Sequence, residues 1–451
     1  MSHLPTLEQL GAALAAGRTR ALALTEAALA RAQDAAGEGA RVFTHISRER
    51  ALAAARASDT LRAAGIVRSP LEGIPVSVKD LFDVAGEVTT AGSAVLRGAP
   101  PATRNAPVID RLIAAGAVIV GRTNMSEFAF SGLGLNPHWG TPANPWDRAS
   151  RRIPGGSSSG AAVSVTDGMA AVAIGSDTGG SVRIPAALCG LTGFKPTQRR
   201  VSIDGTVPLS TSLDSIGPLG ASVRCCAITD AVLAGQPVPA PTVRDVAGTR
   251  LAVPQTVVLD GMDATVASAF ERALSRLSAA GARITRLAVP EFAQFAALNA
   301  RGTLAAAEAW AWHRALLAER GAEYDPRVSS RIRGGEKMGA ADYIDLLAAR
   351  RRWIAQVGAR VSGFDALVLP TVPIVAPRMA NLEASDEAYF AANGLILRNP
   401  TLINFLDGCA LSLPCHAPGQ APVGLMLAGP GGRDPDILAL GQGVELLLRA
   451  A

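Results

Sequence analysis

Ser181 is the residue of this sequence whose surroundings are best suited to chemistry. It follows Gly179 and Gly180 in the run DTGGSVRIP, which spans residues 177–185. Glycines adopt backbone angles that other residues avoid, so that successive N–H groups can point at one position. Such donors stabilise the negative oxygen that develops when a nucleophile attacks a carbonyl group. The pattern therefore predicts a serine-dependent acyl transfer.

A serine hydroxyl needs a base that removes its proton, and histidine is the usual one. The sequence has five histidines, and two of them, His138 in NPHWG and His416 in PCHAP, lie in predicted loops. No G-x-S-x-G motif surrounds Ser181, so the nucleophile turn of an α/β-hydrolase is not supported. The two loop histidines stay open as candidate bases.

Lysine is the alternative base, and this chain has few lysines. Of its 43 basic residues only three are lysines, at Lys79, Lys195 and Lys337. Lys79 follows the apolar run GIPVSV at 73–78, a predicted buried strand, and burial lowers the pKa of a lysine by up to ~3–5 units. A structural ion pair with the adjacent Asp80 explains this position equally well. Spacing alone leaves both interpretations open.

The elements around these residues alternate between helices and strands. A helix is predicted over 105–115 and a strand over 118–120, which is typical of an α/β fold. Residues 131–160 are rich in Gly, Pro, Ser and Asn, and long ordered loops of this kind often line active sites. The loop ends in GGSSSG at 155–160, a run that also fits a linker or a phosphate-binding turn. Helices are further predicted over 6–36, 48–64, 161–173, 263–280 and 292–318, a glycine-containing turn over 174–185, and strands or extended segments over 250–258, 283–289, 368–377, 410–414 and 423–427.

Composition excludes several classes of protein. Apolar residues make up 49% and charged residues 18% of the 451 residues, which indicates a globular chain. The net charge is only +5, the arginines are scattered and 4% of residues are aromatic, so no nucleic-acid partner is expected. No apolar run reaches the ~18 residues of a membrane span, and the first ten residues lack a secretory pattern. Five cysteines without a CxxC pair argue against disulfides and zinc, so a cytoplasmic protein is expected.

Three segments together resemble the motifs of the amidase signature family. They are Lys79-Asp80, GGSSSG at 155–160 and DTGGSVRIPA at 177–186, and Ser157 stands 24 positions before Ser181, as in that family. Further agreement lies in GRTNM (121–125), NPWD (144–147), GFKPT (193–197), LDSIGPL (213–219) and PVGL (422–425). The resemblance runs from about residue 5 to about residue 445.

The resemblance implies a Ser–cis-Ser–Lys triad. Ser181 would be the nucleophile, and Ser157, preceded by a cis peptide bond, would pass protons between it and the base Lys79. The backbone N–H groups of the oxyanion hole would come from Thr178, Gly179, Gly180 and Ser181. Asp177 and Arg183 match family positions that brace this turn. No metal and no cofactor are implied.

The implied fold is of the α/β class, with one large α/β/α domain over residues 1–451 and a mixed central β-sheet flanked by helices. The catalytic motifs would lie within 73–220, and residues 364–430 would complete the sheet and the pocket. The implied reaction is hydrolysis of a small amide or urea-type substrate through an acyl-enzyme, with release of ammonia or an amine.

The substrate pocket is expected along residues 125–139, which match the segment that lines the acyl pocket in the family. The residues predicted to bind substrate are Phe130, Ser131 and Gly132. One member type hydrolyses glutamine as part of a tRNA-dependent amidotransferase, and it carries an acid where our alignment places Leu397. This difference favours a stand-alone amidase, with a homodimer as the expected assembly. The glutamine-hydrolysing subunit stays open as an alternative, and so does a catalytically silent homologue that binds an anion in its glycine-rich loops.

Overall fold

Within residues 4–449, eleven strands form one sheet. The structure, a computed structural model, describes residues 4–449. The strands stand in the order β1-β3-β2-β4-β6-β5-β10-β11-β9-β7-β8. Their bounds are β1 (Phe43–Ile46), β2 (Pro75–Lys79), β3 (Val118–Thr123), β4 (Val172–Asp177), β5 (Thr192–Lys195), β6 (Ser215–Gly220), β7 (Arg250–Pro254), β8 (Arg283–Leu287), β9 (Ala366–Pro370), β10 (Cys409–Pro414) and β11 (Gly424–Gly429).

The sheet is mixed, as predicted. β2 is parallel to both β3 and β4, and β9 and β8 are parallel to β7. The strands between them, from β4 through β6, β5, β10 and β11 to β9, pair antiparallel. Parallel neighbours end at the same edge of a sheet. Because Val78 of β2 pairs with Ile174 of β4, the ends of these strands bring Lys79 and Asp177 to one edge.

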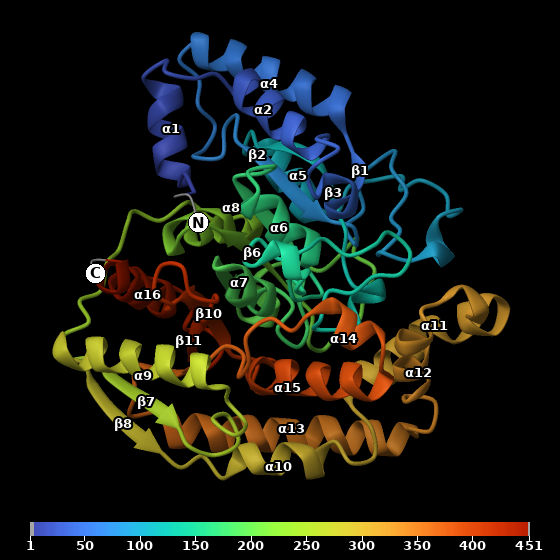
Figure 1. The fold of residues 1–451 in the computed structure, drawn as a ribbon, viewed down its shortest axis with the longest axis vertical. Coiled ribbons are helices and arrows are strands. Elements are labelled where there is room, and N and C mark those ends of the chain that lie inside the picture. The colour runs from blue at the N-terminus through green and yellow to red at the C-terminus, as the bar shows by residue number, and fades with distance from the viewer. Residues whose placement is uncertain (1–3, 450–451) are drawn as a thin grey trace.

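Helices flank this sheet, which confirms the predicted α/β class. Their bounds are α1 (Leu7–Ala15), α2 (Ala21–Ala32), α3 (Gly39–Val42), α4 (Arg48–Ala63), α5 (Pro107–Ala114), α6 (Ser159–Thr166), α7 (Arg183–Cys189), α8 (Val223–Ala234), α9 (Ala264–Ala279), α10 (Glu291–Leu298), α11 (Leu304–Arg320), α12 (Pro326–Arg333), α13 (Ala340–Val361), α14 (Met379–Glu383), α15 (Asp386–Phe405) and α16 (Asp434–Arg449). α2 and α4 pack near β2 and β3, α8 packs on β5 and β6, and α16 packs on β10 and β11. Figure 1 shows α2 and α4 at one end of the molecule and α10 and α13 at the other.

The prediction is wrong over residues 161–173, where an apolar run of small residues indicates a single helix. α6 ends at Thr166, and Gly168 follows in the left-handed region at φ +67°. The chain then enters β4, whose six residues are all buried. A strand buried on both faces shows no alternation of apolar and polar residues, so its pattern does not separate it from a helix. The predicted turn over 174–185 is therefore strand as far as Asp177.

Two segments far apart in the sequence, 65–235 and 364–430, pack together as their turn-rich sequences predict. Strand β5 of the first pairs with β10 of the second, and Ala410 lies opposite Lys195. Both strands place side chains in one apolar core, together with residues of α8 and α16. The edge of the sheet that carries the sequence motifs thus receives residues from both segments.

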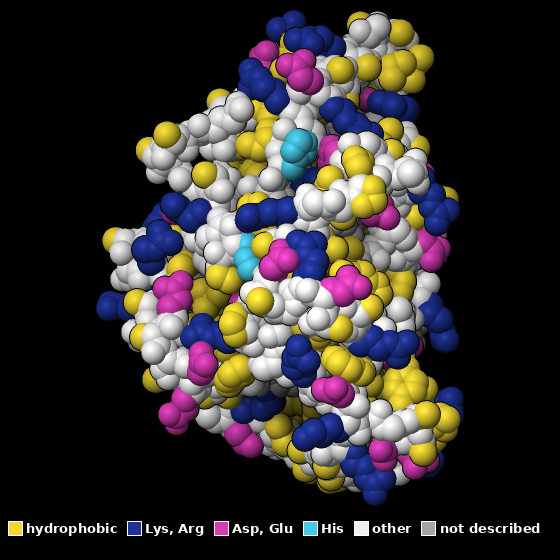
Figure 2. Space-filling model, turned by 90° about the vertical axis from the view of Figure 1, so that its right-hand side faces the viewer, with side chains coloured by type: hydrophobic (Ala, Val, Ile, Leu, Met, Phe, Trp, Pro, Cys, Tyr) yellow, Lys and Arg dark blue, Asp and Glu magenta, His cyan; other side chains and the backbone are white. Residues whose placement is uncertain are grey.

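The face of the molecule shown in Figure 2 carries no large patch of one charge. Lysine and arginine side chains are scattered there among acidic and apolar ones. Across residues 4–449, no helix has the length and apolarity that crossing a membrane requires.

Candidate active site

Lys79 ends strand β2 and is fully buried. Its Nζ donates hydrogen bonds to Ser157 Oγ at 2.7 Å and to Ser176 Oγ at 2.8 Å. Asp80 is engaged elsewhere, because its Oδ1 accepts a hydrogen bond from Arg122 Nε at 2.7 Å. The structural ion pair between Lys79 and Asp80 is therefore wrong, and the interpretation as a base is the one that the geometry allows.

Burial lowers the pKa of Lys79 to about 7, although the negative charges of Asp214 and Asp177 oppose that change. A water-free environment disfavours the ammonium form of the side chain. A lysine with such a pKa is partly neutral near pH 7, and a neutral amine can accept a proton.

The Ser157 loop lies between Lys79 and the Ser181 turn. The peptide bond between Gly156 and Ser157 is cis. The N–H of Ser158, at the start of α6, donates to the backbone carbonyl of Ser181 at 3.3 Å, which holds the two serine segments together. Across the described residues no hydrogen bond joins the hydroxyl groups of Ser157 and Ser181. In unliganded enzymes such catalytic hydrogen bonds often close only when substrate binds.

The Ser181 turn follows directly on β4. Gly180 has φ +123°, a left-handed conformation that favours glycine, and a Cβ there would lie 2.5 Å from Pro400 Cβ. Its N–H donates to Asp177 Oδ1 at 2.8 Å. That amide is therefore occupied, which corrects its predicted place among the oxyanion donors. The backbone N–H groups of the other three predicted donors, Thr178, Gly179 and Ser181, have no hydrogen-bond acceptor within the described chain, so they are free to bind a negative oxygen.

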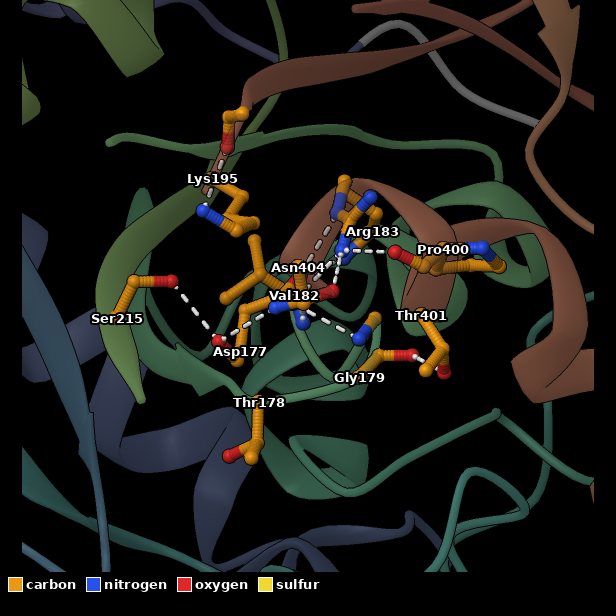
Figure 3. A network of polar contacts seen from close by, with 12 residues as sticks. Asp177, Thr178, Gly179, Val182, Arg183, Lys195, Ser215, Pro400, Thr401 and Asn404 are labelled. Atoms are coloured by element: carbon orange, nitrogen blue, oxygen red, sulfur yellow. Dashed lines mark hydrogen bonds and ion pairs between the residues drawn. The ribbon is translucent and has the colours of Figure 1, made fainter. Parts of the chain in front are cut away.

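Asp177 and Arg183 form a fully buried ion pair beneath this turn (Figure 3). The guanidinium binds both carboxylate oxygens, with Nη2 2.8 Å from Oδ1 and Nε 2.9 Å from Oδ2. Asn404 of α15 adds a hydrogen bond from Nδ2 to Oδ1 at 2.9 Å. Burial alone would raise the pKa of Asp177, but the charge and hydrogen bonds of Arg183 hold it well below its ordinary range. The turn is thus braced by a permanently charged pair.

The predicted pocket residues lie against the Ser157 loop. The carbonyl of Gly132 accepts a hydrogen bond from Gly156 N at 2.8 Å. Ser131 Oγ donates to Asn393 Oδ1 at 3.1 Å. Phe130 is 7% exposed, and the guanidinium of Arg331 lies 4.4 Å from the centre of its ring.

The two candidate histidine bases lie in other networks. His138 Nε2 is 2.8 Å from Glu127 Oε1. His416 Nδ1 accepts a hydrogen bond from Val423 N at 3.3 Å. Within the described part of the chain neither histidine is hydrogen-bonded to Ser181, so the structure brings only a lysine to the serines.

Sequence reasoning missed three side chains at this site: Ser176, Asn404 and Arg331. Ser176 directly precedes Asp177, so its position before the DTGGS motif was the available signal. Asn404 and Arg331 come from α15 and α12, more than a hundred residues further along the chain. No local pattern marks either of them, because only the tertiary fold brings Asn404 to Asp177 and Arg331 to Phe130.

The chain resembles known proteins in sequence and in fold. The family model described as Amidase matches residues 23–438. The chain is 40% identical over 403 residues to 2-amino-5-chloromuconic acid deaminase of Comamonas testosteroni, a match that covers 88% of this chain and 87% of that protein. It is 36% identical over 461 residues to a glutamyl-tRNA(Gln) amidotransferase subunit of Chloroflexus aggregans, with 95% and 93% covered.

A solved structure described as a crystal structure of amidase superposes with a TM-score of 0.87 at 34% identity, and covers 98% of this chain and 99% of that one. The matches confirm both the fold class and the resemblance carried by the three sequence motifs. The chain therefore belongs to the amidase family and is a hydrolase that acts on carbon–nitrogen bonds other than peptide bonds.

Proposed function

We propose that this enzyme hydrolyses a small amide through an acyl-enzyme on Ser181, with Ser157 as proton relay and Lys79 as base. The observation that carries the proposal is the 2.7 Å hydrogen bond between Lys79 Nζ and Ser157 Oγ. It connects a buried amine at this edge of the sheet to a hydroxyl beside the nucleophile turn, whereas Lys195, the other buried lysine of the described residues, donates to the carbonyls of Pro196 and Gly408.

The first half of the reaction breaks the amide. Ser181 Oγ attacks the carbonyl carbon while its proton passes to Ser157 Oγ and the proton of Ser157 passes to Lys79 Nζ. The amides of Gly179 and Ser181 stabilise the oxyanion. When the intermediate collapses, the C–N bond breaks, and the proton returns through Ser157 to the leaving nitrogen. The products are ammonia or an amine and an ester on Ser181.

The second half frees the enzyme by the same path. Water attacks the ester carbonyl and gives its proton, through Ser157, to Lys79. Collapse of this second intermediate returns the proton to Ser181 Oγ and releases a carboxylic acid. The lysine is neutral again at the end, so the cycle balances without any other cofactor.

The substrate that we propose carries a carboxylate. Arg331 contacts the predicted pocket through Phe130, whose carbonyl accepts a hydrogen bond from its Nη1. No carboxylate of the described chain lies within ion-pair distance of Arg331. A charged group that is partly removed from water is stabilised by an opposite charge, and a guanidinium matches a carboxylate in shape. The relative from Comamonas testosteroni is named for an acid, which supports this assignment.

A stand-alone amidase is favoured over the glutamine-hydrolysing subunit. Leu397 lies over the pocket, since a Cβ on Gly132 would be 3.1 Å from its side chain. An apolar side chain offers no partner for the ammonium group of a free amino acid. We therefore propose that the chain is active without a partner protein.

We also propose that the enzyme works in the cytoplasm. All five cysteines are free thiols, and four of them are buried. Reduced thiols are typical of a reducing compartment.

The test of the proposed function is a panel of small primary amides with and without a carboxylate, assayed for ammonia in the presence and absence of hydroxylamine. Hydroxylamine attacks an acyl-enzyme and yields a hydroxamate. Ser181→Ala and Lys79→Ala should lose both products by at least ~10³-fold. The control Lys337→Ala, at an exposed lysine, should keep wild-type rates. Glutaminase activity that requires a partner protein, with no hydrolysis by the pure chain, would contradict the proposal.

Arg331→Met tests the substrate class in the same panel. It should lower kcat/KM for amides that bear a carboxylate by about 10–100-fold. Neutral amides of the same size should be unaffected. Arg333→Met, an exposed arginine on the same helix, is the matched control. Equal losses on both classes of amide would assign Arg331 a structural role only.

A further inference from the structure

Asp214 is a buried carboxylate that the proposed reaction does not use. It is 6% exposed and directly precedes strand β6. Its Oδ2 accepts hydrogen bonds from the N–H groups of Leu209 and Ser210, both at 3.0 Å, and its Oδ1 accepts one from Thr178 Oγ1. Within residues 4–449, no basic side chain lies at ion-pair distance from it. A charge in this position is costly to bury, which invites a functional explanation.

Asp214 lies beside the catalytic machinery on the sheet edge. Asp177 and Ser215 are paired residues of β4 and β6, so Thr178 and Asp214, one step beyond them, are neighbours. A small cavity lies beside Asp214. Its polar lining includes Ser176, Thr178, Asp214 and Ser215, and the remainder is mostly apolar. Ser176 lines the same cavity as Asp214 and accepts a hydrogen bond from Lys79 Nζ, so one residue lies between the cavity and the lysine.

We propose that Asp214 is a positioning residue that acts on the oxyanion turn through Thr178 and on Lys79, which lies beyond Ser176, through its negative charge. The inference rests on the proposed function of Lys79 as base. The hydrogen bond from Thr178 to Asp214 fixes the position of Thr178, the residue that begins the nucleophile turn. The negative charge of Asp214 opposes the effect of burial on Lys79, so the lysine is a stronger proton acceptor than it would be without that charge.

The other charges around the site leave Asp214 as the net negative charge that acts on Lys79. Asp177, at the end of β4, also acts on Lys79, but its charge is balanced by Arg183 of α7. Glu308 of α11 acts on Asp214 through its negative charge and accepts a hydrogen bond from Ser210 Oγ at 2.9 Å.

Burial and Glu308 raise the pKa of Asp214 to about 6, although its hydrogen bonds from Thr178 and the Ser210 and Leu209 amides oppose the change. Burial lowers the pKa of Lys79 to about 7. The two values are close enough for each group to influence the titration of the other. At neutral pH the carboxylate is charged while the lysine accepts and returns its proton.

The experiment compares Asp214→Asn with Thr178→Val in pH profiles of kcat/KM. Asparagine keeps the shape, because its oxygen can accept from the two backbone amides while its Nδ2 donates to Thr178 Oγ1. Only the charge is lost, so the acidic limb should move to lower pH by about one unit. Thr178→Val keeps the charge, so its limb should stay in place while kcat falls roughly tenfold through a displaced turn.

Asp230→Asn is the matched control, since Asp230 is also a buried carboxylate on α8, and it pairs with Arg200, away from the lysine. Its acidic limb should remain at the wild-type pH. An unmoved limb in Asp214→Asn, or an equal shift in Thr178→Val, would overturn the inference. If the acidic limb of the wild-type kcat/KM profile does not arise from the titration of Lys79, the proposed function itself is overturned.

A second measurement serves if Asp214→Asn does not fold. The chain has only three lysines, so protein labelled with ¹³C at lysine Cε gives three signals. Lys337→Arg and Lys79→Met identify the signal of Lys79. In the wild-type enzyme this signal should titrate in two steps, the lower one reporting Asp214. A single step near the limb of the activity profile would overturn the inference.

Discussion

Lys79 shows how the surroundings of one residue decide its chemistry. The sequence places it after an apolar strand and beside Asp80, and that pattern is compatible with a base or with an ion pair. The choice depends on Arg122, which lies 42 positions beyond Asp80 along the chain and takes its carboxylate. The role that we propose for Lys79 could therefore be predicted from the family motifs, whereas its freedom from a carboxylate partner required the fold.

The pH dependence of catalysis follows from the same residue. Burial lowers the pKa of Lys79 to about 7, and only the neutral amine can act as base. We expect kcat/KM to rise tenfold per unit of pH below this value and to level off above it. A profile measured from about pH 5 to pH 9 tests this expectation.

Histidine variants are the control for that profile. His138→Gln and His416→Gln should leave the acidic limb in place, because both imidazoles are engaged in other networks. If either variant loses the acidic limb of the kcat/KM profile, the histidine that was replaced is the base.

At the scale of elements, the unit that carries the chemistry is strand β4, the turn after it and helix α7. Its glycines and its serine could be recognised from the sequence. The strand itself could not, since complete burial removes the alternation of apolar and polar residues. Two long predicted helices are also divided, 6–36 into α1 and α2 at Gly17 and 292–318 into α10 and α11 before Leu304. Periodicity identified these helices but not the breaks in them.

Gly180→Ala tests the turn. A Cβ at φ +123° would be strained and would meet Pro400 and Ile184 at 2.5 and 2.7 Å. The turn must shift to accommodate it, so we expect kcat to fall by at least ~100-fold while circular dichroism shows a folded protein.

The matched control is Gly358→Ala in α13, where an added Cβ meets nothing within 4 Å. This change should leave activity untouched and raise the free energy of unfolding by about 0.5–1 kcal/mol, because alanine favours a helix. Wild-type activity in Gly180→Ala would show that the turn does not need its glycine.

At the scale of the molecule, one sheet joins the motif-bearing segment 65–235 to the segment 364–430. Strand β5 of the first segment pairs with β10 of the second, and residues of both segments share one apolar core. The turn-rich character of both segments predicted their association. The order of the strands could not be predicted, because antiparallel pairing between distant segments leaves no trace in local sequence.

Whether the two segments form one folded unit can be tested by cutting the chain. The cut is placed in the exposed stretch 236–243, between α8 and β7. A protease site inserted there should yield two pieces that co-elute in size-exclusion chromatography and keep most of the activity, because β5–β10 pairing holds them. The pieces should separate only in denaturant. Separation in native buffer would mean that the two segments are independent domains.

The hydrogen bond from Asn404 to Asp177 has a consequence for how the enzyme is made. The two residues are 227 positions apart. At roughly 5–20 residues per second, a ribosome adds Asn404 about 10–45 s after Asp177. During that interval the nascent chain carries the complete nucleophile motif and the Asp177–Arg183 pair, but not the helix that adds Asn404. A product released early from the ribosome therefore lacks this last hydrogen bond to the turn.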